Sequence, residues 1–316
     1  MALFRKSRDS RSFAPSWCAW FGPGEWAAFQ ELVRERLVPD YARQQALSRS
    51  LPGGPASEMD LAHLAETLRD QPRERWSTTV TEYELWWEDR AREAQALAVL
   101  PFERARGALL PAVRLVQESD RPDEMTRALG DHLLAEVRLI GERSVLTVDT
   151  EQTRQWDVSP ADVWSLALAN LRRQPCEVHD MGPDGSPVLV VLGSGEHTAA
   201  HLLRLDELAG RPALYGVLVV APRTDALAFW VVTGMNVVTA GPALQKFSAS
   251  LRDRAEPEQR LSDEVYWWSD GLLEHIVMAD LEAGMTRGLG TPDRPHTIQG
   301  TPRFLDMLHR MAPPQQ

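Results

Sequence analysis

Three residues in the second half of the chain, Glu196, His197 and His201, carry side chains that bind metals or transfer protons. Histidines four positions apart share one face of an α-helix, where their ring nitrogens can hold a divalent metal ion. The order differs from the His-Glu-x-x-His motif of zinc proteases, because here the glutamate precedes the first histidine. A third ligand would come from elsewhere, for example from His179 or Asp180. One hypothesis is therefore a metal-assisted hydrolase using His197 and His201, and the alternative is two histidines on a half-exposed helix face.

Other catalytic motifs are incomplete. The segment Gly193–Gly195 precedes a predicted helix, yet it matches neither the P-loop nor the dinucleotide-binding motif. Cys176 lies three residues before His179, a spacing that directs the two side chains to opposite faces of a strand. Adjacent carboxylates such as Asp206 and Glu207 arise freely among 45 acidic residues, and we interpret them as solvated. The catalytic residues stay unknown, and no cofactor is predicted.

Arg223 and Asp225 connect two apolar segments, Leu214–Val220 and Ala226–Val232. Near-continuous apolar runs of this length are typical of central strands. A turn held by rigid strands is a suitable place for a binding group, so one hypothesis is that Arg223 and Asp225 bind a small anionic ligand. The alternative is that Asp225 caps the turn while Arg223 pairs with a surface carboxylate.

The chain has 11 tryptophans and only 4 tyrosines. Two pairs are adjacent, Trp86 with Trp87 and Trp267 with Trp268, and adjacent side chains on a helix or strand cannot both face one core. Exposed tryptophans are enriched in protein interfaces. We therefore expect these four residues to form a contact surface, with packing between two parts of this chain as the alternative.

The elements that position these residues change in type along the chain. The first third has helical spacing of apolar residues, which predicts helices over Glu25–Leu37, from Ser57 to before Pro72, from Thr79 to before Pro101, and a short one over Phe102–Leu110.

From Pro111 onward the apolar residues alternate, as in strands. A hairpin is predicted over 133–149, and Ser159 with Pro160 predicts the start of a helix. Further elements are expected as follows: strands over Cys176–Met181, Val188–Leu192 and Val265–Trp268, a helix over about Glu196–Leu208, and a helix opened by Gly241 and Pro242. The sequence thus predicts an α+β fold with a helical N-terminal region, 1–110. A mixed, mainly antiparallel sheet core with packed helices follows in 111–316.

Charge and composition exclude several classes of function. A net charge of −11 repels phosphate backbones and argues against a dedicated nucleic-acid binder. No apolar run approaches the length of a membrane span or a signal-peptide core. Two distant cysteines, Cys18 and Cys176, fit a reducing compartment better than a disulfide framework. We expect a cytoplasmic protein that contacts neither nucleic acid nor membrane.

Several strings along residues 102–271 resemble the YtpQ-like bacterial family. They are Leu109-Leu-Pro-Ala-Val-Arg-Leu115, Trp156-Asp-Val-Ser-Pro160, Leu202-Leu-Arg-Leu-Asp-Glu-Leu208 and Ala221-Pro-Arg-Thr-Asp225. The resemblance implies an α+β fold and a bacterial cytosolic setting, but no reaction, since the family has no known function. The family usually has Asp directly after Arg in the last string, whereas Thr224 intervenes here.

Together these observations predict a cytosolic, non-catalytic interaction or regulatory protein. Its acidic surface favours a basic protein partner, because opposite charge raises the association rate. The metal-assisted hydrolase and the small-ligand binder are the alternatives, and the sequence does not determine the oligomeric state.

Overall fold

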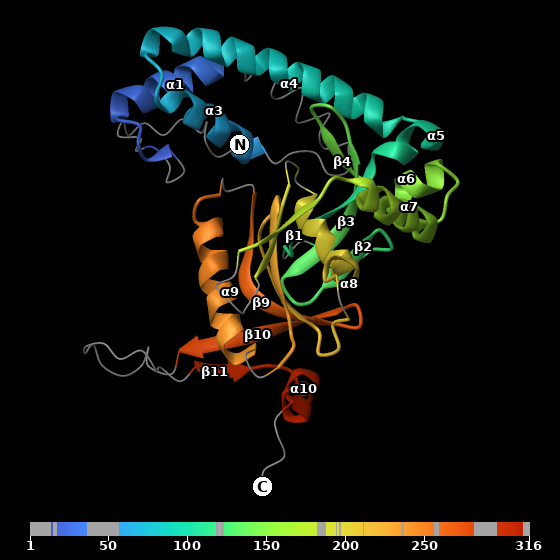
Figure 1. The fold of residues 1–316 in the computed structure, drawn as a ribbon. Coiled ribbons are helices and arrows are strands. Elements are labelled where there is room, and N and C mark those ends of the chain that lie inside the picture. The colour runs from blue at the N-terminus through green and yellow to red at the C-terminus, as the bar shows by residue number, and fades with distance from the viewer. Residues whose placement is uncertain are drawn as a thin grey trace, which may run out of the picture. The chain divides into compact units, whose positions relative to one another are not determined.

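The protein is represented by a computed structural model that describes residues 14, 18–36, 57–117, 120, 123–181, 188–193, 195, 197–210, 212–234, 237–255, 259–280 and 296–311 (Figure 1). The chain forms two compact units. The helical unit comprises Met1–Ala105 and Leu139–Thr147, and the sheet unit comprises Arg106–Arg138 and Val148–Gln316. The fold is α+β, with N-terminal helices followed by two antiparallel sheets with packed helices, as the sequence predicted.

The helical unit is built on amphipathic helices. Its described elements are α1 (Pro23–Arg36), α3 (Ser57–Arg69), the 3-10 turn η3 (Arg73–Arg75), α4 (Trp76–Ala98), α5 (Phe102–Ala105) and the short strand β4 (Val145–Thr147). Aromatic rings fill the core, where the Phe21 ring centroid lies 5.4 Å from that of Phe29 and 5.5 Å from that of Trp76. Helix α4 starts at Trp76, earlier than the predicted Thr79. Trp76 and Val80 belong to this core, so their burial extends the helix toward the N-terminus.

A hairpin tip, 141–144, is bound to α4 within the helical unit. The Glu93 carboxylate accepts hydrogen bonds from the backbone N–H groups of Glu142 (2.7 Å) and Arg143 (2.8 Å) and from the Ser144 hydroxyl (2.7 Å). Burial alone would raise the pKa of Glu93, but these hydrogen bonds outweigh it and hold the pKa below its ordinary value. The contact explains why residues far apart in the sequence belong to one unit.

The strands form two antiparallel sheets, which belong to the sheet unit except for β4 and the end of β3. The smaller has the strand order β1-β3-β2, with β4 paired to β3, and the larger has the order β11-β10-β9-β7-β8-β6-β5. The strands are β1 (Leu109–Leu115), β2 (Thr126–Leu129), β3 (Leu133–Ile140), β5 (Glu177–Asp180), β6 (Leu189–Leu192), β7 (Val217–Arg223), β8 (Ala226–Val231), β9 (Arg260–Ser269), β10 (Leu272–Asp280) and β11 (His296–Gln299). Strands β7 and β8 are almost wholly buried in the centre of the larger sheet, as their apolar sequences predicted.

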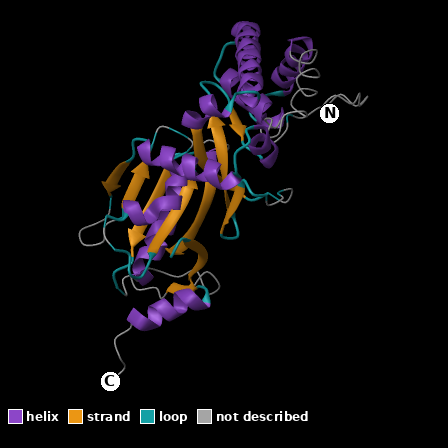
Figure 2. Ribbon diagram, turned by 90° about the vertical axis from the view of Figure 1, so that its right-hand side faces the viewer, coloured by secondary structure: helices purple, strands orange, loops and turns teal. Residues whose placement is uncertain are grey.

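Helices lie against these strands, as Figure 2 shows. The helices of the sheet unit are η4 (Arg106–Ala108), α6 (Thr150–Gln155), α7 (Pro160–Arg173), η5 (Thr198–Arg204), α8 (Leu205–Leu208), α9 (Val237–Arg252) and α10 (Pro302–Met311). Helix α7 packs on β1, and α9 packs on β7 and β9. The predicted start of α7 is confirmed, because the Ser159 hydroxyl accepts a hydrogen bond from the backbone N–H of Asp162 at 3.1 Å.

Two predicted helices differ from the structure. Helix α9 begins at Val237 and contains Pro242 in its interior, so the expected start at Gly241 and Pro242 is wrong. Burial of Val237 and Leu244 in the core offsets the hydrogen bond that the proline cannot donate. The segment expected to be one α-helix over 196–208 is instead the 3-10 helix η5 followed by the short α8.

No helix within the described ranges is both long enough and apolar enough to span a bilayer.

Candidate functional site

The histidine pair predicted to bind metal lies at and within η5. The backbone N–H of Ala199 donates a hydrogen bond of 2.8 Å to the Thr224 carbonyl in the β7–β8 turn. This N–H group therefore has its partner outside η5. His197 is the residue that precedes η5 and His201 lies inside it, so the four-residue spacing does not place the two side chains on one face of an α-helix. The expectation that His197 and His201 share one face of an α-helix is therefore wrong.

His201 is a core residue. It is 2% exposed, and its Nδ1 accepts a hydrogen bond from Arg204 Nε at 2.9 Å. Burial, with the nearby charges of Arg204 and His197, lowers the pKa of His201 to about 4. The imidazole is therefore neutral at physiological pH and already has one ring nitrogen engaged.

The other metal-ligand candidates do not join these histidines. His179 lies on the edge strand β5, with Nε2 3.3 Å from a carboxylate oxygen of Glu177. Among the residues that the structure describes, no group of three His, Cys, Asp or Glu side chains is placed to hold a metal ion. The geometry thus lends no support to the hydrolase hypothesis.

Both cysteines are free thiols. Burial raises the pKa of Cys18 to about 11. Burial also raises the pKa of Cys176, although Arg204 acts in the opposite direction. Since the thiolate is the nucleophile, neither cysteine is activated for catalysis.

Arg223 and Asp225 bind each other. Arg223 donates from Nε to Asp225 Oδ1 at 2.7 Å and from its terminal nitrogen to Oδ2 at 2.6 Å. The same nitrogen of Arg223 lies 3.3 Å from Gln259 Oε1. This bidentate pair satisfies both charges within the turn, so neither group is held ready for a ligand. The structure agrees more closely with the structural alternative, except that the partner of Arg223 is Asp225 itself.

The adjacent tryptophans on β9 separate as strand alternation requires. Trp267 is 3% exposed, packs edge-to-face against Phe304 with ring centroids 5.4 Å apart, and donates its indole N–H to the Tyr215 carbonyl at 2.9 Å. Gly216, at φ +79°, leaves the space for this ring, because a Cβ there would lie 2.4 Å from the indole nitrogen. Trp267 is thus part of the core and not of a contact surface, whereas Trp268 is half-buried on the opposite face.

Trp268 lines a surface cleft of about 670 Å³ in the sheet unit. The other lining residues are Leu203, Asp206, Glu207, Gly210, Pro212, Ala213, Asp270 and Gly271. None of them is basic, so the described wall combines an aromatic ring with three carboxylates. From the sequence, Asp206 and Glu207 were identified only as one adjacent acidic pair among many. The approach of Trp268 and Asp270 to this pair depends on the β9–β10 hairpin.

The three carboxylates of this cleft differ in how they are paired. Glu207 accepts from Arg172 Nε at 2.8 Å and from Arg204 at 3.2 Å. Asp270 is 3.6 Å from a guanidinium nitrogen of Arg303. Asp206 is exposed and forms no ion pair within the described residues. Negative charge is therefore neutralised on one side of the cleft and left open at Asp206.

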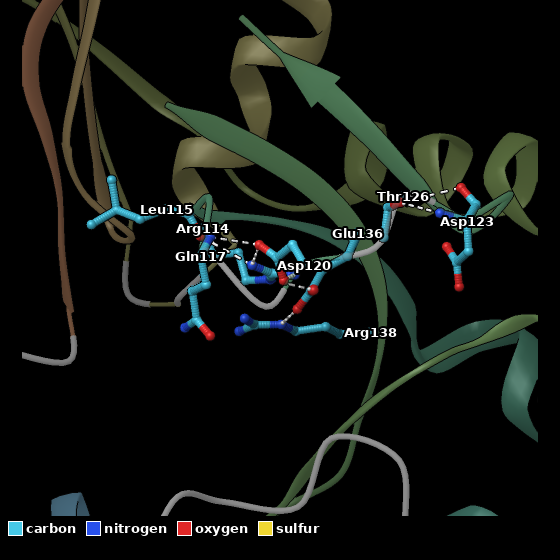
Figure 3. Close-up of polar contacts among 8 residues, drawn as sticks. All are labelled: Arg114, Leu115, Gln117, Asp120, Asp123, Thr126, Glu136 and Arg138. Atoms are coloured by element: carbon cyan, nitrogen blue, oxygen red, sulfur yellow. Dashed lines mark hydrogen bonds and ion pairs between the residues drawn. The ribbon is translucent and has the colours of Figure 1, made fainter. Parts of the chain in front are cut away.

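An ion network around the buried Glu136 of β3, formed with Arg114, Asp120 and Arg138, was not predicted from the sequence (Figure 3). Arg114 donates to Glu136 at 2.7 Å and to both oxygens of Asp120 at 2.7 and 2.8 Å, while Arg138 Nε donates to Glu136 at 2.8 Å. The one signal in the sequence is a glutamate and an arginine two positions apart inside an apolar strand, on the same face.

Electrostatics in this network favour the charged forms. Burial alone would raise the pKa of Glu136, but the charge of Arg138 and the hydrogen bonds from both arginines outweigh it and lower the pKa. The hydrogen bond from Arg114 lowers the pKa of Asp120, and that carboxylate in turn raises the pKa of Arg114. Within the described residues, two arginines of this network face two carboxylates, so the positive and negative charges are matched.

Trp86 and Trp87 belong to the helical unit, on α4. Trp86 is 38% exposed and Trp87 is half-buried.

The chain matches no protein-family model, no curated protein and no solved structure. The resemblance of residues 102–271 to the YtpQ-like family stays a prediction.

Proposed function

We propose that the protein is a non-catalytic interaction or regulatory protein of the cytoplasm that binds a basic segment of a partner protein. The observation that carries the proposal is the cleft around Trp268, which combines an indole ring with carboxylates and has no basic residue among its described lining. A bound metal or nucleic acid has no comparable support, because no group of three possible metal ligands comes together among the described residues and the protein carries a net charge of −11.

The cleft fits the chemistry of an arginine side chain. A guanidinium can stack on an indole face, a contact worth about 0.5–2 kcal/mol, and can donate two parallel hydrogen bonds to a carboxylate. The Trp268 ring makes no stacking contact with another ring or with an arginine in the described part of the chain, and Asp206 has no counter-charge there. One aromatic face and one carboxylate are thus both open to a cation.

The remaining properties of the chain agree with such a role. Its net negative charge attracts a basic partner over a distance and raises the association rate at low ionic strength. The two cysteines are free thiols with no activated character, which agrees with a reducing compartment.

A direct test measures the affinity of a fluorescently labelled oligo-arginine peptide for the full-length protein by anisotropy. We expect binding that weakens between about 50 and 200 mM salt, because the attraction is electrostatic. Trp268→Ala should weaken binding about tenfold and Asp206→Asn about threefold to tenfold. Oligo-lysine of the same length should bind less tightly, because an ammonium group cannot donate to a carboxylate in bidentate fashion.

Asp253→Asn is the matched control, because Asp253 is an exposed aspartate of the same unit outside the cleft. It should leave the affinity within about twofold of the wild type. Arg211 stands between two lining residues in the sequence and lies outside the described residues. Arg211→Ala should leave binding unchanged or strengthen it, by removing a competing positive charge. Equal affinity for the wild type, Trp268→Ala and Asp206→Asn would contradict the proposal.

A further inference from the structure

The Trp268 cleft carries three carboxylates, which are neutralised to different extents. Glu207 is already bound by two arginines. Asp206 is exposed and forms no ion pair within the described residues. The surroundings of Asp270 therefore decide whether the cleft presents one open carboxylate or two.

Asp270 is held at the tip of the β9–β10 hairpin. Ser269 pairs with Leu272, so Asp270 and Gly271 are the two central residues of the turn. Both have positive φ, +53° and +78°, as a tight type I′ hairpin turn requires. The turn therefore fixes the backbone position from which the Asp270 side chain projects, two residues after Trp268.

The charge of Asp270 is only weakly neutralised. Its side chain is 89% exposed, and the guanidinium nitrogen of Arg303 with which it pairs lies 3.6 Å away. Arg303 also donates a hydrogen bond of 2.5 Å to Glu274, so its charge already has a closer partner. Exposed ion pairs contribute little to stability, and water or a ligand can replace them. Asp270 is thus a second carboxylate of the cleft that can bind a cation.

The Trp268 ring favours a peptide over a small cation. Its indole N–H forms no hydrogen bond within the described part of the chain. A partner that covers this N–H has to supply an acceptor, and a backbone carbonyl is one. A protonated polyamine has no acceptor. A divalent metal ion would need a group of three ligands, and the described residues provide none.

We propose that the Trp268 cleft binds a dibasic segment of the partner protein. One arginine stacks on Trp268 and pairs with Asp206, a second basic residue pairs with Asp270, and a backbone carbonyl of the segment accepts the indole N–H. The cleft volume of about 670 Å³ falls in the range of about 300–1,000 Å³ that holds drug-sized molecules, so the cleft admits more than one guanidinium. The inference rests on the proposed function, because it assumes a basic segment in this cleft, and it adds the number and placement of the basic residues.

The test measures the affinity of labelled peptides for the full-length protein by anisotropy. One peptide carries a single arginine in a glycine-serine sequence. Two others carry a pair of arginines, either adjacent or separated by one glycine. We expect at least one paired peptide to bind about tenfold more tightly than the single-arginine peptide, whereas two equivalent arginines competing for one site would give about twofold.

Asp270→Asn isolates the second contact. Asparagine tolerates positive φ, so this change removes the charge without opposing the turn. It should reduce the advantage of the paired peptide from about tenfold to about twofold and leave the single-arginine affinity within about twofold of the wild type. Trp268→Ala should instead weaken the binding of every peptide, because it removes the first contact. Asp253→Asn is the matched control and should leave both affinities unchanged.

An advantage that persists in Asp270→Asn, or an advantage of no more than about twofold in the wild type, would overturn the inference. Spermidine that binds as tightly as the paired peptides would also overturn it, by assigning the cleft to small polyamines. If oligo-arginine binding still depends on Trp268, such a failure leaves the proposed function intact. If oligo-arginine does not bind the wild type, the proposed function fails as well.

Discussion

Two groups of acidic side chains in the sheet unit differ in whether arginine side chains neutralise their negative charge. Around β1 and β3, the carboxylates of Asp120, which follows β1, and of Glu136 are bound by Arg114 and Arg138 at 2.7–2.8 Å, and the Glu136 side chain is 4% exposed. At the Trp268 cleft, Asp206 is exposed and unpaired within the described residues. Similar residue types thus form a closed network in one place and an open acidic surface in the other.

The difference separates residues that stabilise the fold from residues that are free to bind. A buried carboxylate cannot stay charged without partners, so the chain must supply the arginines that Glu136 needs. An exposed carboxylate is solvated by water and places no such demand, so its charge is available to a partner. The contrast predicts large effects on stability at the network and negligible effects at the cleft.

The largest effect is expected from Glu136→Gln. This change leaves two arginines without their shared buried carboxylate and should lower the free energy of unfolding by about 3 kcal/mol. Urea unfolding measures the loss, and hydrogen exchange should show faster exchange in β1 and β3. Glu124→Gln, at an exposed glutamate of the same unit, is the control and should change stability by less than about 0.5 kcal/mol. Equal stability of the two variants would show that the network contributes nothing.

An intermediate effect is expected from acid, through His201. Its pKa is about 4 in the folded protein against an ordinary 6.5, so protonation favours the unfolded chain. Stability should therefore fall as the pH drops below about 6.5, by about 2 kcal/mol between pH 7 and pH 5, and the loss should level off below pH 4.

The carboxylates of the network act at lower pH. The pKa values of Glu136 and Asp120 are lowered from ordinary values of 4.5 and 3.8. Their contribution to the free energy of unfolding is therefore lost only below about pH 5, where the unfolded chain takes up protons. His201→Gln removes the imidazole and should flatten the pH dependence between pH 7 and pH 5. Urea unfolding at several pH values measures both proteins, and an unchanged slope in the variant would contradict the assignment.

The smallest effect on stability is expected from Asp206→Asn. The side chain is exposed and forms no ion pair within the described residues, so unfolding should change by less than about 0.5 kcal/mol. Thermal unfolding monitored by calorimetry checks this. A loss of more than about 1 kcal/mol would mean that Asp206 is a structural residue and would remove the distinction between the cleft and the network.

Local patterns in the sequence were sufficient for most of the fold. The alternation over 133–149 predicted the β3–β4 hairpin, and Ser159 with Pro160 predicted the start of α7. Two apolar runs predicted the central strands β7 and β8. Each of these signals acts over a few neighbouring residues, so the physical cause is present in the sequence itself. The errors at η5 and α9 have non-local causes: a hydrogen bond to Thr224 and the burial of Val237 against the sheet.

The candidate sites were less accessible to prediction. Strand alternation required that Trp267 and Trp268 face opposite sides, but not which of them lies in the core. The spacing of His197 and His201 suggested a shared face only as long as the segment was assumed to be an α-helix. Arg223 and Asp225 were identified together, yet their mutual ion pair depends on the geometry of the β7–β8 turn.

The sequence by itself determined the α+β class, the acidic charge, the apolar central strands and the presence of tryptophans that could not all be buried. The tertiary structure alone decided which charges are paired. Arg114 on β1 donates a hydrogen bond to Glu136 on β3, whereas Asp206 forms no ion pair within the described residues. It also placed Asp206 beside Trp268 and Asp270, which lie some sixty positions further along the chain. Pairing and burial depend on contacts between distant segments, and no local pattern of residues encodes those contacts.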